Sequence, residues 1–150
     1  MKALTLTQPY ATLIAIGAKH IETRSWYTRY RGQLAIHAAK GYPKEAAQLC
    51  LVDPFMKVLS AAGFHSYGTW RKSMNDLPLG CVIATCDLVE VFTISPYLHH
   101  HKYPMPPPTP EYYFGDYTPA RYAWILENIK PLPEPIPAKG ALGLWEWNQP

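Results

Sequence analysis

Residues 7–40 read TQPYATLIAIGAKHIETRSWYTRYRGQLAIHAAK and carry the signals of one helix followed by two strands. Pro9 suits the first turn of the helix, where its missing N–H needs no partner, and Thr7 is placed to cap that turn. Gly17 suits the end of the helix because glycine tolerates the left-handed backbone conformation. Two strands are predicted to follow, over residues 20–25 and 33–38.

The first of these strands has an unusual composition, because residues 17–26 read GAKHIETRSW. A strand normally carries apolar residues on at least one face. Residues two apart on a strand share a face, so His20, Glu22 and Arg24 are expected on the same side, close to Lys19 in the preceding turn. Either these groups form an ion pair at a solvated sheet edge, or they converge on a molecule that is not part of the protein.

The sequence outside this segment predicts four more strands and a pair of helices. The strands cover residues 2–6, 81–92, 121–129 and 143–147, and the helices lie within residues 41–63. Mostly antiparallel strands in a small chain, with glycine and proline at the corners, favour a closed or nearly closed barrel. We therefore predict an α+β fold of a single domain, residues 1–150, with about six mostly antiparallel strands and helices inserted near the N-terminus.

Two proline-rich stretches are expected to lie outside the barrel strands. Residues 96–119 contain seven prolines and three consecutive histidines at 99–101, and we interpret them as an irregular excursion over the surface with one helical turn. The alternating prolines at 131, 133, 135 and 137 indicate an extended linker that cannot pair as a central strand.

Size and composition restrict the class of protein. The chain has 150 residues, of which 48% are apolar and 17% charged, so it can form a packed core. No apolar run is long enough to span a bilayer and the N-terminus lacks the pattern of a signal peptide, so we expect a cytoplasmic protein without a membrane partner. Three cysteines, Cys50, Cys81 and Cys86, lack metal-ligand spacing and are predicted to be reduced core residues.

Charge is distributed unevenly along the chain, although the net charge is only +3. Residues 1–44 carry seven basic residues and one acidic residue, whereas the remaining 106 residues carry seven basic and ten acidic residues. Such asymmetry indicates either a basic face for an anionic partner or charges that balance in three dimensions.

The pattern resembles the ASCH domain, the activating-signal-cointegrator homology domain. The resemblance rests on the Gln-Pro-Tyr start of the helix at residues 8–10, the Gly-Ala-Lys turn at 17–19, Glu22 and Arg24 on the strand, and the Arg-Gly turn at 31–32. Looser similarity continues at residues 80–92, 121–128 and 139–147. It implies a PUA-like β-barrel with a cleft beside the first helix, and a link to RNA metabolism or nucleic-acid binding.

Some small bacterial members of the family hydrolyse N4-acylated cytidine. That branch uses a lysine in the Gly-x-Lys turn, a threonine three residues later and a more distant glutamate. Lys19 matches the lysine, but Glu22 stands where the threonine is expected. Thr23 is adjacent to Glu22, and strand alternation is expected to turn it to the other face.

The candidate site residues come mainly from this first third of the chain. Ligand-binding residues are predicted to be Lys19, His20, Glu22, Arg24, Trp26 and Tyr27. The nucleic-acid track is predicted to be Arg24, Arg29, Arg31 and Lys40, since cations and interleaved aromatic rings suit single strands. His37 is interpreted as a hydrogen-bonded structural residue, and one of Asp87 and Glu90 is expected to face the cleft or solvent. We expect no metal and no cofactor, since adjacent histidines on an extended chain point in different directions.

Three functional hypotheses follow. The first is a nucleic-acid-binding module that recognises RNA, single strands or a modified nucleobase in a cleft lined by lysine, glutamate and arginine, with the insert at 96–119 as one wall. The second is a small amidohydrolase of acylated cytidine, or a ribonuclease, that uses Lys19 and Glu22 as catalytic residues. The third is a protein-interaction domain, although no obligate protein partner is predicted.

Overall fold

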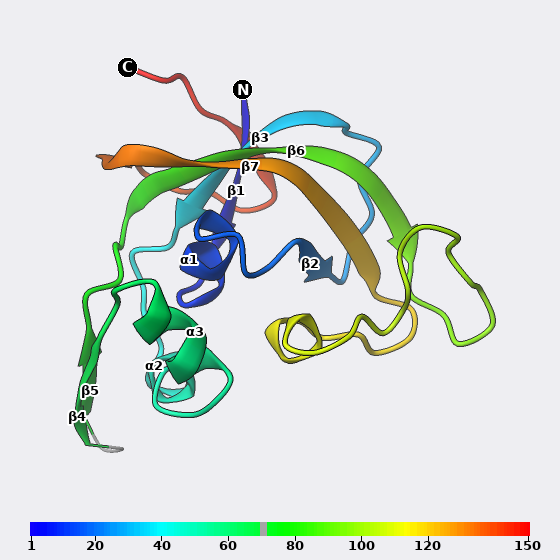
Figure 1. Cartoon of the computed structure of the whole chain (residues 1–150). Helices are drawn as coiled ribbons and strands as arrows, with labels where there is room; N and C mark the ends of the chain where they lie inside the picture. The colour runs from blue at the N-terminus through cyan, green and yellow to red at the C-terminus, as the bar shows by residue number, and fades with distance from the viewer. Residues whose placement is uncertain (70–71) are drawn as a thin grey trace.

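The computed structural model describes residues 1–69 and 72–150 and contains a curved six-stranded sheet wrapped around a short helix (Figure 1). The sheet order is β2-β7-β6-β3-β1-β8, in which β1 pairs with β3 in parallel and the other neighbours are antiparallel. Its strands are β1 (Lys2–Leu6), β2 (Ile21–Arg24), β3 (Gly32–Ala38), β6 (Cys81–Thr93), β7 (Tyr122–Pro137) and β8 (Leu144–Glu146). The predicted α+β fold with about six mostly antiparallel strands is confirmed, as a half-barrel.

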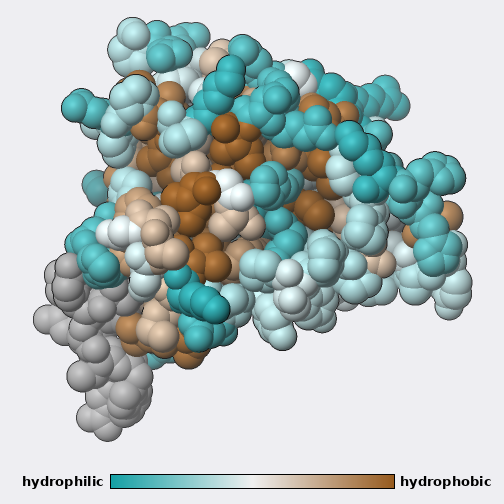
Figure 2. Space-filling model, viewed as in Figure 1, coloured by the Kyte–Doolittle hydropathy of each residue, from teal (hydrophilic) through white to brown (hydrophobic). Residues whose placement is uncertain are grey.

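The helices lie on the concave side of the sheet and beyond it. They are α1 (Tyr10–Ala15), α2 (Lys44–Leu49), α3 (Phe55–Ala61) and the short 3₁₀ helix η1 (Glu111–Phe114). Ala11 and Ile14 of α1 belong to one buried cluster with Leu34, Leu88 and Trp124 of the sheet. Figure 2 shows apolar residues gathered on this face beneath the arch of β6 and β7. No helix in the described parts of the chain is long and apolar enough to cross a bilayer.

The start of α1 is held by a residue other than the predicted one. Thr7 provides no side-chain cap, so that prediction is wrong. The buried Gln8 side chain takes the role, because its Oε1 accepts from the Thr12 N–H at 3.0 Å and its Nε2 donates to Thr12 Oγ1 and to the Pro78 carbonyl at 2.8 Å. Gly17, with φ of +76°, ends the helical segment as expected. The amide of Gln8 thus links the helix to the segment that enters β6.

The interpretation of residues 131–137 as an unpaired linker is wrong. These residues continue β7 beside β6, where Pro131 pairs with Ala84 and Pro137 with Cys81. β2 covers only residues 122–125 of β7, so the prolines lie where β7 has no second neighbour. The Ala138 N–H is directed at the Gly80 carbonyl of the segment before β6. N–H groups alternate sides along a strand, so the adjacent Pro137 stands where an N–H would face away from β6 and no donor is needed.

Other parts of the chain follow the sequence more closely. The two helices within residues 41–63 are confirmed, and Asp53 accepts a hydrogen bond from the Lys57 N–H at the start of α3. A two-stranded ladder of β4 (Ser66–Thr69) and β5 (Lys72–Asn75) was not predicted. All three cysteines are buried thiols outside any disulfide, as expected. Burial raises the pKa of the Cys86 thiol to about 12, with a smaller contribution from Asp87.

Candidate functional site

Lys19 is buried in the turn between α1 and β2. Its side chain is only 1% exposed, and its ammonium donates at 2.5 Å to the carbonyls of Ile21 and Phe114. The same nitrogen lies 3.6 Å from Glu22 Oε2. The ammonium thus donates to two backbone carbonyls and forms an ion pair with Glu22 that is longer than a hydrogen bond. Lys19 therefore positions Glu22 and the insert, and it is not a solvated lysine.

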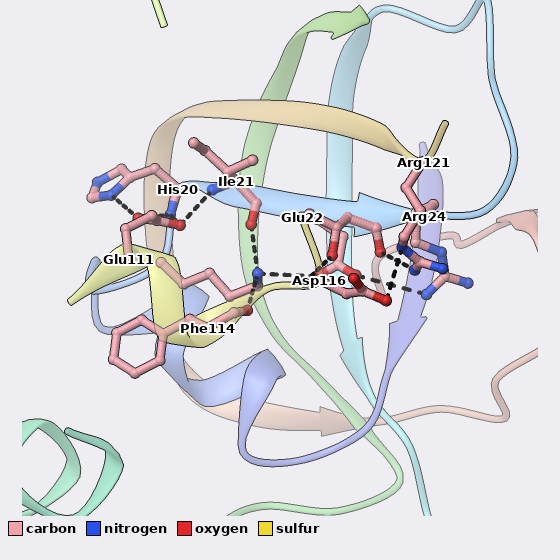
Figure 3. Close-up of polar contacts among 10 residues, drawn as sticks. His20, Ile21, Glu22, Arg24, Glu111, Phe114, Asp116 and Arg121 are labelled. Atoms are coloured by element: carbon pink, nitrogen blue, oxygen red, sulfur yellow. Dashed lines mark hydrogen bonds and ion pairs between the residues drawn. The ribbon is translucent and has the colours of Figure 1, made fainter. Parts of the chain in front are cut away.

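The insert is tied to β2 at a second point. The Glu111 carboxylate in η1 accepts from the N–H groups of His20 and Ile21 at 2.9–3.0 Å, and His20 Nδ1 lies 3.5 Å from it (Figure 3). His20 precedes β2 and is directed towards Glu111, so it does not share the face of Glu22 and Arg24 as predicted. Lys19 and His20 thus both contact the insert and hold it against β2.

A cavity of about 260 Å³ lies between α1, β2 and the insert. It is lined by Tyr10, Glu22, Thr23, Phe114, Gly115 and Asp116. Glu22 is 7% exposed, so its side chain is almost buried in the wall of this cavity. The expectation that Thr23 turns to the other face is wrong, because Thr23 also lines this cavity and its Oγ1 accepts from the Asp116 N–H at 2.9 Å. The insert folds over the end of β2 and encloses both side chains.

Charges of alternating sign surround the cavity, as Figure 3 shows for Glu22, Arg24, Asp116 and Arg121. Arg24 Nη1 lies 3.9 Å from Glu22 Oε1. Arg121 Nε lies 3.4 Å from Asp116 Oδ2, and its Nη2 donates to the Thr23 carbonyl. Hydrogen bonds from the Thr118 hydroxyl and N–H lower the pKa of the Asp116 carboxyl, and Arg121 adds to this shift. The arrangement offers acceptors and donors side by side, as the edge of a planar polar ligand requires.

Three buried donors next to the cavity lack a hydrogen-bond partner among the described residues. They are Trp124 Nε1, Arg121 Nε and Tyr117 Oη. Trp124 stands opposite Glu22 in the β2–β7 ladder, Arg121 is paired with Asp116, and the Tyr117 ring packs against Gly115. Burial raises the pKa of Tyr117, and the nearby carboxylates of Glu111 and Glu22 raise it further. None of the three residues lines the cavity at Glu22, and Arg121 Nε still has Asp116 as an ion-pair partner.

The sequence of the chain matches a known protein family. The family model of the ASCH domain matches residues 4–136. The chain belongs to the ASCH domain family. It is also 27% identical over 145 residues to human Activating signal cointegrator 1, and 26% identical to the mouse protein. These matches cover 95% of this chain and 22% of each relative, so the chain spans about a fifth of their length.

The aromatic residues predicted for the site take different positions in this ASCH domain. Trp26 is half-buried, packs edge-to-face on Trp124 at 4.7 Å and carries the Arg24 guanidinium 5.7 Å from its ring. Tyr27 is 48% exposed and lies 5.7 Å from the Tyr122 ring. Neither residue lines the cavity at Glu22.

The predicted basic track is not brought together as one line. Arg31 donates to the carbonyls of Thr28 and Tyr30 and pairs with Glu90 at 3.3 Å. Arg29 is exposed. Lys40 lines a separate cavity of about 930 Å³ that shares no lining residue with the site at Glu22. Of the four predicted cations, Arg24 is the one paired with a residue of the cavity.

The remaining candidates have structural partners. Asp87 accepts from Asn128 Nδ2 and Glu90 pairs with Arg31. The register of β6 and β7 shifts just before Asp87 and again between Leu88 and Glu90. His100 stacks on Phe92 at 4.4 Å, and its Nδ1 accepts from two backbone N–H groups. Residues 1–69 and 72–150 contain no group of three or more side chains that could hold a metal ion.

His37 is buried in the wall of the separate cavity, where its Nε2 hydrogen-bonds to the Ala138 carbonyl at 3.0 Å. The interpretation of His37 as a hydrogen-bonded structural residue is therefore confirmed. Gly140 lies directly against its ring.

Replacing this glycine is expected to destabilise the fold. A Cβ at Gly140 would lie 2.5 Å from His37 Cε1 and 2.7 Å from Thr5 Oγ1, so we expect Gly140→Ala to lower the free energy of unfolding by about 1–3 kcal/mol. Gly41→Ala is the matched control, because nothing lies within 4 Å of its added Cβ. Urea denaturation measures both; equal stability of the two variants would contradict the steric account.

Proposed function

We propose that this ASCH domain binds single-stranded RNA and takes one unpaired base into the cavity between β2 and the insert. The main observation in support is the nearly buried Glu22 side chain, which lines a cavity of about 260 Å³ and is bordered by Lys19 and Arg24. Ligand pockets for whole small molecules usually exceed about 300 Å³, so this cavity suits a single ring system. Single-stranded RNA offers unstacked bases with free hydrogen-bonding edges.

The chemistry of the cavity supports recognition of a base edge. The Glu22 carboxylate can accept from an exocyclic amino group, a pairing known from carboxylates that read cytosine. Asp116 and Arg121 add a further acceptor and donor at the rim. A base modified at its amino group is a natural variant of such a ligand.

Glu22→Gln tests the role of the carboxylate. The variant keeps the shape of the side chain but loses one acceptor and the charge, so we expect affinity for a short single-stranded RNA to fall by about tenfold or more. Fluorescence anisotropy with labelled hexaribonucleotides measures this. Glu90→Gln is the control, because Glu90 is also paired with an arginine but lies outside the cavity. Equal affinities of the two variants would refute the proposal.

The dependence of binding on salt is expected to be shallow. Arg24 and the exposed Arg29 are the cations expected to meet phosphates, because Arg31 and Lys40 are held elsewhere. One or two phosphate contacts to a single strand correspond to a slope of log K against log salt of about −0.7 to −1.4. Affinity should therefore fall by only about three- to sevenfold between 50 and 200 mM salt. Titration over this range measures the slope, and a slope steeper than about −3 would indicate an extended basic track instead.

Hydrolysis of an acylated base is a second candidate function, favoured by Thr23 and Glu22 lining the same cavity. The hydroxyl and the carboxylate could serve as nucleophile and base in such a reaction. Lys19 is poorly placed as a base, because it is buried, donates to two backbone carbonyls and does not line the cavity. Incubation with N4-acetylcytidine and with RNA, followed by chromatography, tests it; product that is lost in Thr23→Val would favour the enzyme over the binding module.

A further inference from the structure

The insert contains a second cavity next to the one at Glu22. It has a volume of about 540 Å³ and shares Gly115 and Asp116 with the smaller cavity as a common wall. Gly115 presents no side chain there, and a Cβ at this position would lie 2.9 Å from the Tyr117 ring. The chain is therefore thin where the two cavities meet, and a ligand in one lies close to the other.

Three tyrosines are among the twelve residues that line the second cavity. Tyr112 and Tyr113 line it and are 46% and 54% exposed, so their faces are available to a ligand. The Tyr112 ring lies nearly parallel to Tyr117, with centroids 6.1 Å apart. Unpaired bases stack on such rings regardless of sequence, because every base has a π face.

The charge of the second cavity is suited to a neutral ring. Asp116 is the charged residue among its described lining residues, and Arg121 is paired with that carboxylate. A phosphate group has no lysine or arginine to bind inside this cavity.

We infer that the cleft binds two consecutive nucleotides, with the second base stacked on Tyr112 in the insert cavity. The inference rests on the proposed function, since the first base occupies the cavity at Glu22. The smallest ligand that fills both cavities is then a dinucleotide. The tyrosines of the insert would raise the affinity without selecting a particular base.

The experiment compares a ribonucleoside 5′-monophosphate, the dinucleotide and the trinucleotide by isothermal titration calorimetry. The dinucleotide is expected to bind at least about tenfold more tightly than the monophosphate, with little further gain for the trinucleotide. Tyr112→Ala should remove this gain, and Tyr112→Phe should keep it because the ring remains. Tyr97→Ala is the control, since Tyr97 is 88% exposed on the same insert and does not line the cavity. Thermal denaturation verifies that each variant is folded.

The possible outcomes separate the two claims. Binding of the monophosphate without a gain for the dinucleotide overturns the second subsite and leaves the proposed function intact. A gain that survives in Tyr112→Ala also overturns it. Binding of a proline-rich peptide that depends on Tyr112, without a dinucleotide gain, would assign the cavity to a protein segment. Absence of binding by all three nucleotides refutes the proposed function and the inference together.

Discussion

Lys19→Met is expected to lower the free energy of unfolding by about 3–5 kcal/mol. The substitution keeps the length of the side chain but leaves the buried Glu22 carboxylate without its ammonium partner. It also leaves the carbonyls of Ile21 and Phe114 without a donor. Both losses occur at 1% exposure, where water cannot replace the missing donor.

Lys2→Met is the matched control for this prediction. Lys2 also pairs with a glutamate, Glu146, but both side chains are exposed, and surface ion pairs contribute about 0–1 kcal/mol. Guanidinium denaturation of both variants measures the difference. A loss below about 1 kcal/mol in Lys19→Met would show that the buried contacts are not formed in solution.

Phe114→Ala is expected to lower the free energy of unfolding by a similar amount, about 3–5 kcal/mol, through a different mechanism. Phe114 is fully buried and packs edge-to-face on Phe55 at 5.1 Å, within a cluster that includes Leu13 and Leu59. Its carbonyl still accepts from Lys19 in the variant, so the loss isolates the packing of the insert against α1 and α3.

The adjacent Tyr113→Ala provides the control for Phe114. Tyr113 is about half exposed, so its removal should change stability by less than about 0.5 kcal/mol. Limited proteolysis gives an independent readout, because loss of the Phe114 anchor should expose residues 96–119 to cleavage. Resistance equal to the wild-type protein, together with unchanged stability, would show that the insert is held by other contacts.

Much of the fold could be predicted from local signals. The β-branched run at 81–92 and the glycine at position 17 placed β6 and the end of α1 correctly. The extension of β7 through the prolines could not be foreseen, since it depends on β2 being too short to cover that edge. Such a relation between strands is set by tertiary pairing and has no sequence pattern of its own.

The candidate site was only half predictable for a related reason. Glu22 and Arg24 stand two residues apart in sequence and indicated the site, whereas Asp116 and Arg121 reach it from about a hundred residues away. The burial of Lys19 could not be expected, because lysines are almost never fully buried unless paired. Its partner carbonyl belongs to Phe114, in an insert without helical or strand periodicity.

The proline-bearing stretch of β7 has a consequence for behaviour at high concentration. An uncovered strand margin can recruit the strand of a neighbouring molecule and start ordered aggregation. Four alternate prolines remove the amide protons that an incoming chain would need there. This side of the sheet is thereby protected against edge-to-edge association, even though no strand of the described residues pairs with it beyond β2.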